Sequence, residues 1–90
     1  MPHVTFTRHL VRFFPTLTEG EVEGATVREV VAALDRRYPG LASYLVDETG
    51  RLRRHVNVFI GDEPVADRAA LSDALAPTDR VFILQALSGG

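Results

Sequence analysis

The segment Thr26-Val-Arg-Glu-Val-Val-Ala-Ala-Leu-Asp-Arg-Arg-Tyr-Pro-Gly40 predicts the central helix of the fold. Thr26 and Glu29 form a capping box, in which the Thr26 side chain accepts a hydrogen bond from the Glu29 amide and the Glu29 carboxylate reaches back. Pro39-Gly40 then ends the helix. One amphipathic helix is unstable alone, so its apolar stripe requires a sheet to pack against. The stripe comprises Val27, Val30, Val31, Leu34 and Tyr38.

The residues before this helix predict two strands. Residues 4–14 are rich in β-branched and aromatic side chains, and their alternation changes sides near Arg8 to Leu10, which predicts a strand with a bulge there. Pro15 ends this strand, and residues 17–23 are predicted to be its hairpin partner.

The residues after the helix predict the rest of the sheet. Residues 41–45 predict a short turn or helix, and residues 53–60 predict a strand that turns at 61–64 into a short return strand. A short helical turn over 69–75, with Leu71 and Leu75 pointing inward, then leads to the final strand over 80–85.

This order of elements predicts an α+β fold, with one main helix packed on one face of a mixed sheet. Ninety residues are enough for one domain, which we place at 1–86, followed by a flexible Gly-Gly tail over 87–90.

The opposite face of the sheet is expected to carry large apolar side chains. If Val81 and Ile83 join the core, then Phe82 and Leu84 face away from it, and Phe59 is a plausible neighbour on the same side. A cluster of this kind indicates a partner-binding surface. The alternative is that the loop over 41–52 covers it.

Composition excludes several classes of function. The net charge of −2 gives no bulk attraction to nucleic acid, and no apolar run approaches the roughly 20 residues that span a bilayer. The N-terminal residues lack the pattern of a signal peptide, so we expect a cytoplasmic protein. The absence of cysteine removes disulfides and thiolate chemistry, and all ten basic residues are arginine.

Gly89-Gly90 at the end of the sequence has the shape of an enzyme substrate. Glycine has no side chain beside the reacting carbonyl and accepts backbone angles that other residues avoid. A tail of this kind can enter a narrow active site and present its carboxylate for activation. The alternative is an ordinary frayed terminus.

The other polar residues point to weaker hypotheses. The histidines His3, His9 and His55 lack metal-ligand spacing, so no metal site is predicted. A basic patch is formed by Arg51, Arg53, Arg54 and His55. A solvated hairpin is the favoured interpretation of this patch, and contact with an acidic partner or a phosphate is the alternative.

Together, these residues resemble the ubiquitin-like β-grasp sulfur carriers, which include the small subunit of molybdopterin synthase and the sulfur carrier of thiamine biosynthesis. The resemblance is carried by the capped helix, by Val56-Asn-Val-Phe-Ile60 with its Gly-Asp-Glu-Pro turn, and by the run from Thr78-Asp79 to Gly90. The segment 41–55 is most similar to the mycobacterial-type carrier of a cysteine-synthesis pathway.

The resemblance implies a carrier rather than an enzyme, unless the chain is the small subunit of a synthase complex. Gly90 would be adenylated and then converted to a thiocarboxylate, with Gly89 giving clearance beside it. No cofactor would be bound, because an E1-like adenylating enzyme would use the ATP. A sulfur donor protein or a sulfur-accepting synthase would be the other partner. The partner contacts would be Phe59, Phe82, Leu84, Leu87 and Ser88.

Two alternatives remain at this point. One is a ubiquitin-like protein modifier that is conjugated through the same C-terminus. The other is a β-grasp module that binds partners without covalent chemistry, for which the terminal glycines would be dispensable.

Overall fold

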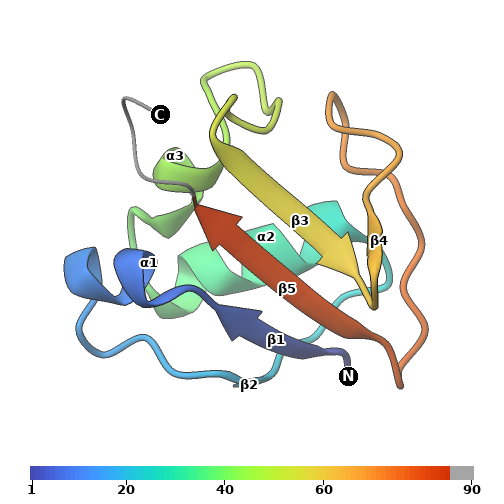
Figure 1. The fold of residues 1–90 in the computed structure, drawn as a ribbon, viewed down its shortest axis with the longest axis horizontal. Helices are drawn as coiled ribbons and strands as arrows, with labels where there is room; N and C mark the ends of the chain where they lie inside the picture. The colour runs from blue at the N-terminus through green and yellow to red at the C-terminus, as the bar shows by residue number, and fades with distance from the viewer. Residues whose placement is uncertain (86–90) are drawn as a thin grey trace.

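Five strands form one mixed sheet in the order β2-β1-β5-β3-β4 (Figure 1). The computed structural model describes residues 1–85, apart from the side chain of His9. The neighbouring strands β1 and β5 run parallel, and the other neighbouring pairs are antiparallel. The strands are β1 (His3–Phe6), β2 (Gly20–Glu21), β3 (Val56–Ile60), β4 (Glu63–Pro64) and β5 (Arg80–Gln85).

The predicted central helix is confirmed as α2 (Val27–Arg37), which crosses one face of the sheet (Figure 1). The Thr26 hydroxyl accepts a hydrogen bond from the Glu29 amide at 3.2 Å. The Glu29 carboxylate reaches back to the Ala25 amide at 2.8 Å, one residue before the cap. The predicted stripe is buried, except for a half-buried Tyr38 at the C-cap. The mixed sheet and this helix confirm the α+β prediction.

The predicted long strand over 4–14 is wrong in its second half. The chain leaves the sheet at Phe6 and forms the short helix α1 (Arg8–Phe13). Leu10 is fully buried, and Val11 and Phe14 pack against the core. These three positions share one face of a helix but not one face of a strand, so the apparent bulge was a change from strand to helix.

The predicted partner strand over 17–23 is confirmed in a shorter form. Only Gly20–Glu21 pairs with β1, where Glu21 lies opposite His3 and Gly20 opposite Val4. The connection between the two strands contains α1, so they do not form a tight hairpin.

After α2, the chain forms the predicted short helix α3 (Leu41–Leu45). The strand predicted over 53–60 begins later, at Val56, because residues 54–55 form a turn. The return strand is present as β4, but it comprises Glu63–Pro64 and therefore lies within the predicted turn over 61–64 rather than after it. The final strand β5 lies at the predicted residues 80–85.

The helical turn predicted over 69–75 is wrong. A turn ends at Ala70, and Leu71 has a positive φ of 55°. The Asp67 carboxylate accepts hydrogen bonds from nearby amides, including that of Ala70 at 2.9 Å, and thereby competes with helical bonding. The prediction that Leu71 and Leu75 point inward is confirmed, since both are buried.

The core lies between the sheet and α2. Val81 and Ile83 of β5 and Val58 of β3 are at most 1% exposed. Within residues 1–85, no helix has the length and apolarity needed to cross a membrane. The predicted tail over 87–90 lies outside the described residues, as does the proposed domain end at residue 86.

Candidate functional site

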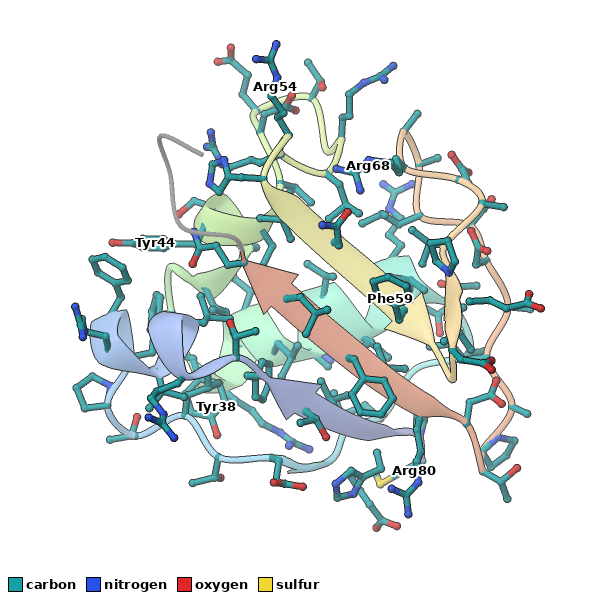
Figure 2. The ribbon with its side chains drawn as sticks, viewed as in Figure 1. Tyr38, Tyr44, Arg54, Phe59, Arg68 and Arg80 are labelled. Carbon is teal, nitrogen blue, oxygen red and sulfur yellow. The ribbon has the colours of Figure 1, made fainter. Side chains whose placement is uncertain are left out.

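The sheet face away from α2 carries the predicted apolar cluster, which we call the open face (Figure 2). Phe59 pairs in register with Phe82, and Asn57 pairs with Leu84. Phe59, Phe82 and Leu84 are half-buried, whereas their neighbours Val58 and Ile83 face the core. The side-chain alternation predicted from the sequence is therefore confirmed.

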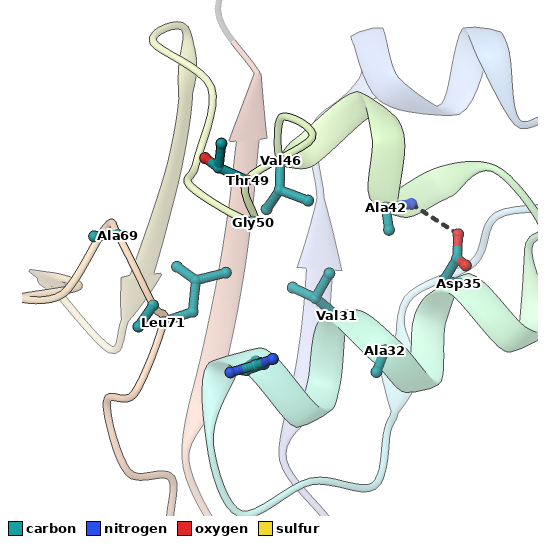
Figure 3. Close-up of a pocket in the computed structure, with 11 residues that line it drawn as sticks. Val31, Ala32, Asp35, Ala42, Val46, Thr49, Gly50, Ala69 and Leu71 are labelled. Atoms are coloured by element: carbon teal, nitrogen blue, oxygen red, sulfur yellow. Dashed lines mark hydrogen bonds between the residues drawn. The ribbon is translucent and has the colours of Figure 1, made fainter.

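The loop over 41–52 does not cover the open face. Its apolar residues Leu41, Leu45 and Leu52 are buried in the core. The rest of the loop packs beside α2, where Val46 and Gly50 line a groove together with Val31 (Figure 3). Phe59, Phe82 and Leu84 therefore remain partly accessible.

The groove beside α2 has a volume of about 420 Å³. Small side chains line much of it, including Ala32, Ala69 and Ala70. The Asp35 carboxylate joins α2 to α3 by accepting a hydrogen bond from the Ala42 amide at 3.0 Å (Figure 3). This carboxylate is thus engaged in holding two helices together.

The last described residue, Gln85, is the root of the C-terminal tail. Gln85 lies opposite Val56 on β3, and its amide donates to the Thr7 hydroxyl at 3.4 Å. The Thr7 amide donates to the Ile83 carbonyl at 3.2 Å, so the start of α1 is tied to the end of β5. Pairing with β3 on one side and hydrogen bonds to Thr7 on the other therefore fix the point from which the tail departs. The predicted site residues Leu87, Ser88, Gly89 and Gly90 lie outside the described residues.

An aromatic cluster between α1 and α3 was missed in the sequence analysis. The Tyr44 ring lies 5.3 Å from the Phe13 ring and 5.1 Å from the Phe14 ring, measured between centroids. Phe13 and Tyr44 are 49% and 37% exposed. The helical spacing of Leu10, Val11 and Phe14 was the available signal, because it places Phe13 outward.

A basic hollow of about 590 Å³ lies at the start of β3. It brings the predicted basic patch together with Arg68, which the sequence analysis did not include. Its lining residues are Asp47, Arg51, Leu52, Arg53, Arg54, His55 and Arg68.

Hydrogen bonds lower the pKa of Asp67 and Asp47, two carboxylates in loops. The Ser72 hydroxyl, helped by the amides of Ala70, Ser72 and Ala69, lowers the pKa of Asp67 from 3.8 to about 2. The hydroxyl and amide of Thr49 likewise lower the pKa of Asp47. Both carboxylates act as acceptors that shape their own loops.

The described residues contain no cluster of metal-binding side chains. Within residues 1–85, no three His, Asp or Glu side chains gather in a way that would hold a metal ion. The arrangement instead combines an open apolar face with a fixed tail root, which is a geometry suited to docking and to presenting a terminus.

These features define a ubiquitin-like β-grasp protein, and comparison with known proteins refines that class. The ThiS family model matches residues 7–90, so the chain belongs to the ThiS family. It is 38% identical over 69 residues to the sulfur carrier protein CysO of Mycobacterium tuberculosis, and the match covers 74% of each chain.

Other relatives support the same assignment. The small archaeal modifier protein 3 of Haloferax volcanii is 32% identical over 89 residues, covering 89% of this chain and 96% of the relative. The crystal structure of the Amycolatopsis orientalis BexX/CysO complex contains a chain that matches with a TM-score of 0.84 and 30% identity. Both chains are covered completely in that comparison.

Proposed function

We propose that the chain is a sulfur carrier whose Gly90 carboxylate is adenylated and then converted to a thiocarboxylate. The observation that carries this proposal is the ThiS family match, which extends to Gly90. The 38% identity to a sulfur carrier protein supports it. The chain acts as a carrier, and its C-terminus is the substrate of a partner enzyme, so the chain itself is not an enzyme. Its place of action is the cytoplasm.

The proposed chemistry is acyl transfer at the tail. The Gly90 carboxylate oxygen attacks the α-phosphorus of ATP, and pyrophosphate leaves. A hydrosulfide then attacks the acyl carbon of the resulting mixed anhydride, and AMP departs with the C–O bond electrons. The product is a thiocarboxylate, and the proton of the hydrosulfide goes to solvent or a partner base. The activating partner supplies the groups that stabilise the developing charge.

The tail and the open face have separate roles in this proposal. Residues 87–90 reach at most about 13–14 Å when extended, which is enough to enter a recessed active site. Gly89 leaves space beside the reacting carbonyl, while Leu87 and Ser88 contact the walls of this active site in the partner. Phe59, Phe82 and Leu84, which lie on the open face, dock the globular domain. The tail would start from a fixed root, which lowers the entropy cost of presenting it.

The partners are an E1-like adenylating enzyme, which binds the ATP, and a sulfur donor or sulfur-accepting synthase. A carrier of similar fold occurs in the BexX/CysO complex, which supports a protein partner. The recipient pathway would make cysteine, molybdopterin or another sulfur-containing metabolite.

Conjugation to other proteins is the second candidate, because one relative is a small archaeal modifier protein. Both functions begin with adenylation and differ in the acceptor. A search for covalent adducts of the chain in lysates separates them, since a dedicated carrier gives none.

ATP–pyrophosphate exchange tests the proposal. The purified chain is mixed with ATP, labelled pyrophosphate and each E1-like adenylating enzyme of the same organism in turn. We expect exchange with the wild-type chain and with the surface control Thr18→Ala, and none with Gly90→Val, because a branched side chain crowds the reacting carbonyl. Equal exchange by Gly90→Val, or none by the wild type with any enzyme, would contradict the proposal.

A further inference from the structure

The basic hollow concentrates positive charge in a chain whose net charge is −2. Four of its ten arginines line the hollow, and Asp47 is the single carboxylate among the lining residues. That carboxylate accepts hydrogen bonds from the Thr49 hydroxyl at 2.6 Å and from the Arg51 amide at 3.2 Å. Within residues 1–85, the ion pairs of the structure involve none of these four arginines.

Two of the arginines hold the hollow in shape. The Arg68 guanidinium donates to the carbonyls of Arg53 and Val56 at 2.7 and 2.8 Å. The Arg53 guanidinium donates to the Ser43 carbonyl at 2.8 Å. These bonds tie together three segments that are distant in sequence, and so they preorganise the hollow.

The other two arginines are available for binding. Arg51 and Arg54 are exposed, and their guanidinium groups make no hydrogen bond or ion pair to any described residue. Figure 2 shows Arg54 projecting away from the start of β3 into solvent. A guanidinium presents a planar fork of donors that matches a carboxylate.

The hollow also lies beside the tail root. Val56, the first residue of β3, pairs with Gln85, the last described residue of β5. Arg54 precedes Val56 by one turn residue, so its charge is held at the end of the sheet from which the tail departs (Figure 2). A protein that receives the tail must bring its own surface close to this end of the sheet.

We propose that the basic hollow binds an acidic surface of the adenylating partner, beside the entrance that receives the tail. This inference rests on the proposed function and adds to it the chemistry of a second contact, separate from the open face. Arg51 and Arg54 pair with carboxylates of the partner. Their long-range electrostatic attraction also raises the rate at which the two proteins associate in the productive orientation.

The test is the KM for the carrier chain in ATP–pyrophosphate exchange, measured at ionic strengths of about 0.01 M and about 1 M, where the screening length falls from about 30 to about 3 Å. We expect Arg51→Gln/Arg54→Gln to raise this KM about tenfold at low salt and to leave it near the wild-type value at high salt. The turnover number and the KM for ATP should not change.

Two matched variants control the experiment. Arg28→Gln/Arg36→Gln removes the same charge from exposed positions of α2 and should keep the wild-type KM. Arg51→Lys/Arg54→Lys keeps the charge and should recover most of the affinity at low salt. Thermal unfolding of each variant checks that the fold is intact.

The results of this experiment separate failure of the proposed function from failure of the inference about the basic hollow. No exchange with the wild-type chain would overturn the proposed function, and this inference with it. Exchange with an unchanged carrier KM at both salt concentrations would overturn this inference alone. A raised KM for ATP would assign the hollow to nucleotide phosphate, and a lowered carrier KM would indicate that the hollow restrains the chain's own tail. Either result would overturn the proposed contact.

Discussion

Among the glycines at positions 1–85, Gly24 is the one at which backbone conformation and packing leave least freedom. It precedes α2 with a φ of +152°, and a Cβ atom there would lie 2.8 Å from both the amide nitrogen and Cγ2 of Val30. The nitrogen belongs to the helix backbone, so it cannot move aside as a flexible side chain would. The chain therefore enters α2 by passing directly over its first turn.

We predict that Gly24→Ala lowers the free energy of unfolding by about 1–3 kcal/mol, the usual range for overpacking. Gly20→Ala is the matched control, because nothing lies within 4 Å of its added Cβ. Urea denaturation of both variants measures the difference. Equal stability of the two variants would show that the segment before α2 adjusts freely.

Asp67 makes stability depend on pH. Its pKa is about 2 in the folded chain, against an ordinary value of 3.8. Because the folded pKa is lowered, the stabilisation is fully present above pH 3.8 and is lost as the pH falls through about 2. The underlying bonds include one of 2.5 Å from the Ser72 hydroxyl.

We predict that the urea midpoint of the wild-type chain falls over this pH window more steeply than that of Asp67→Asn, which has no carboxyl to titrate. Asp62→Asn is the control, since Asp62 is exposed in a turn and its carboxylate accepts no hydrogen bond from the described residues. A wild-type midpoint that changes in parallel with that of Asp67→Asn would contradict the assignment.

At the scale of elements, α2 was predictable because its signals are local. The capping residues, the apolar spacing and the Pro39-Gly40 stop lie within one segment. The segment over residues 4–14 was not predictable in the same way, because its first apolar residues fit a strand and its later ones fit a helix. Burial of Leu10 and the bonding of Thr7 to β5 decide where the strand ends, and those contacts join distant parts of the chain.

The cap of α2 gives a prediction at this scale. Thr26→Ala removes the hydroxyl that accepts from Glu29, and we expect it to lower the free energy of unfolding by about 1 kcal/mol. Thr18→Ala, at an exposed position without a hydrogen bond to the described residues, should change it little. Chemical denaturation compares the two, and an equal effect would contradict the capping role.

At the scale of the whole molecule, the open face was predictable and the basic hollow only in part. Alternation within β3 and β5 placed Phe59, Phe82 and Leu84 on one side without knowledge of any other element. The hollow needs Arg68, which the fold brings from beyond the β3–β4 turn to the start of β3. No sequence spacing encodes that approach.

The open face should control partner binding independently of stability. We predict that Phe82→Ala raises the KM for the carrier chain in the exchange assay about tenfold or more, because central aromatic residues dominate protein interfaces. Ile83→Val, on the core side of the same strand, should instead cost about 0.5–1.5 kcal/mol of stability and leave the KM unchanged. If Ile83→Val raised the KM and Phe82→Ala left it unchanged, the open face would not be part of the interface.

The most direct measurement is the accurate mass of the C-terminal peptide after incubation of the chain with ATP, the adenylating enzyme and sulfide. We predict a gain equal to the exchange of one oxygen for sulfur, located at Gly90 and reactive towards a thiol-selective label. The label has no competing thiol, because the chain contains no cysteine. An unmodified, unlabelled Gly90 in a chain that the same enzyme adenylates would contradict the sulfur-carrier function.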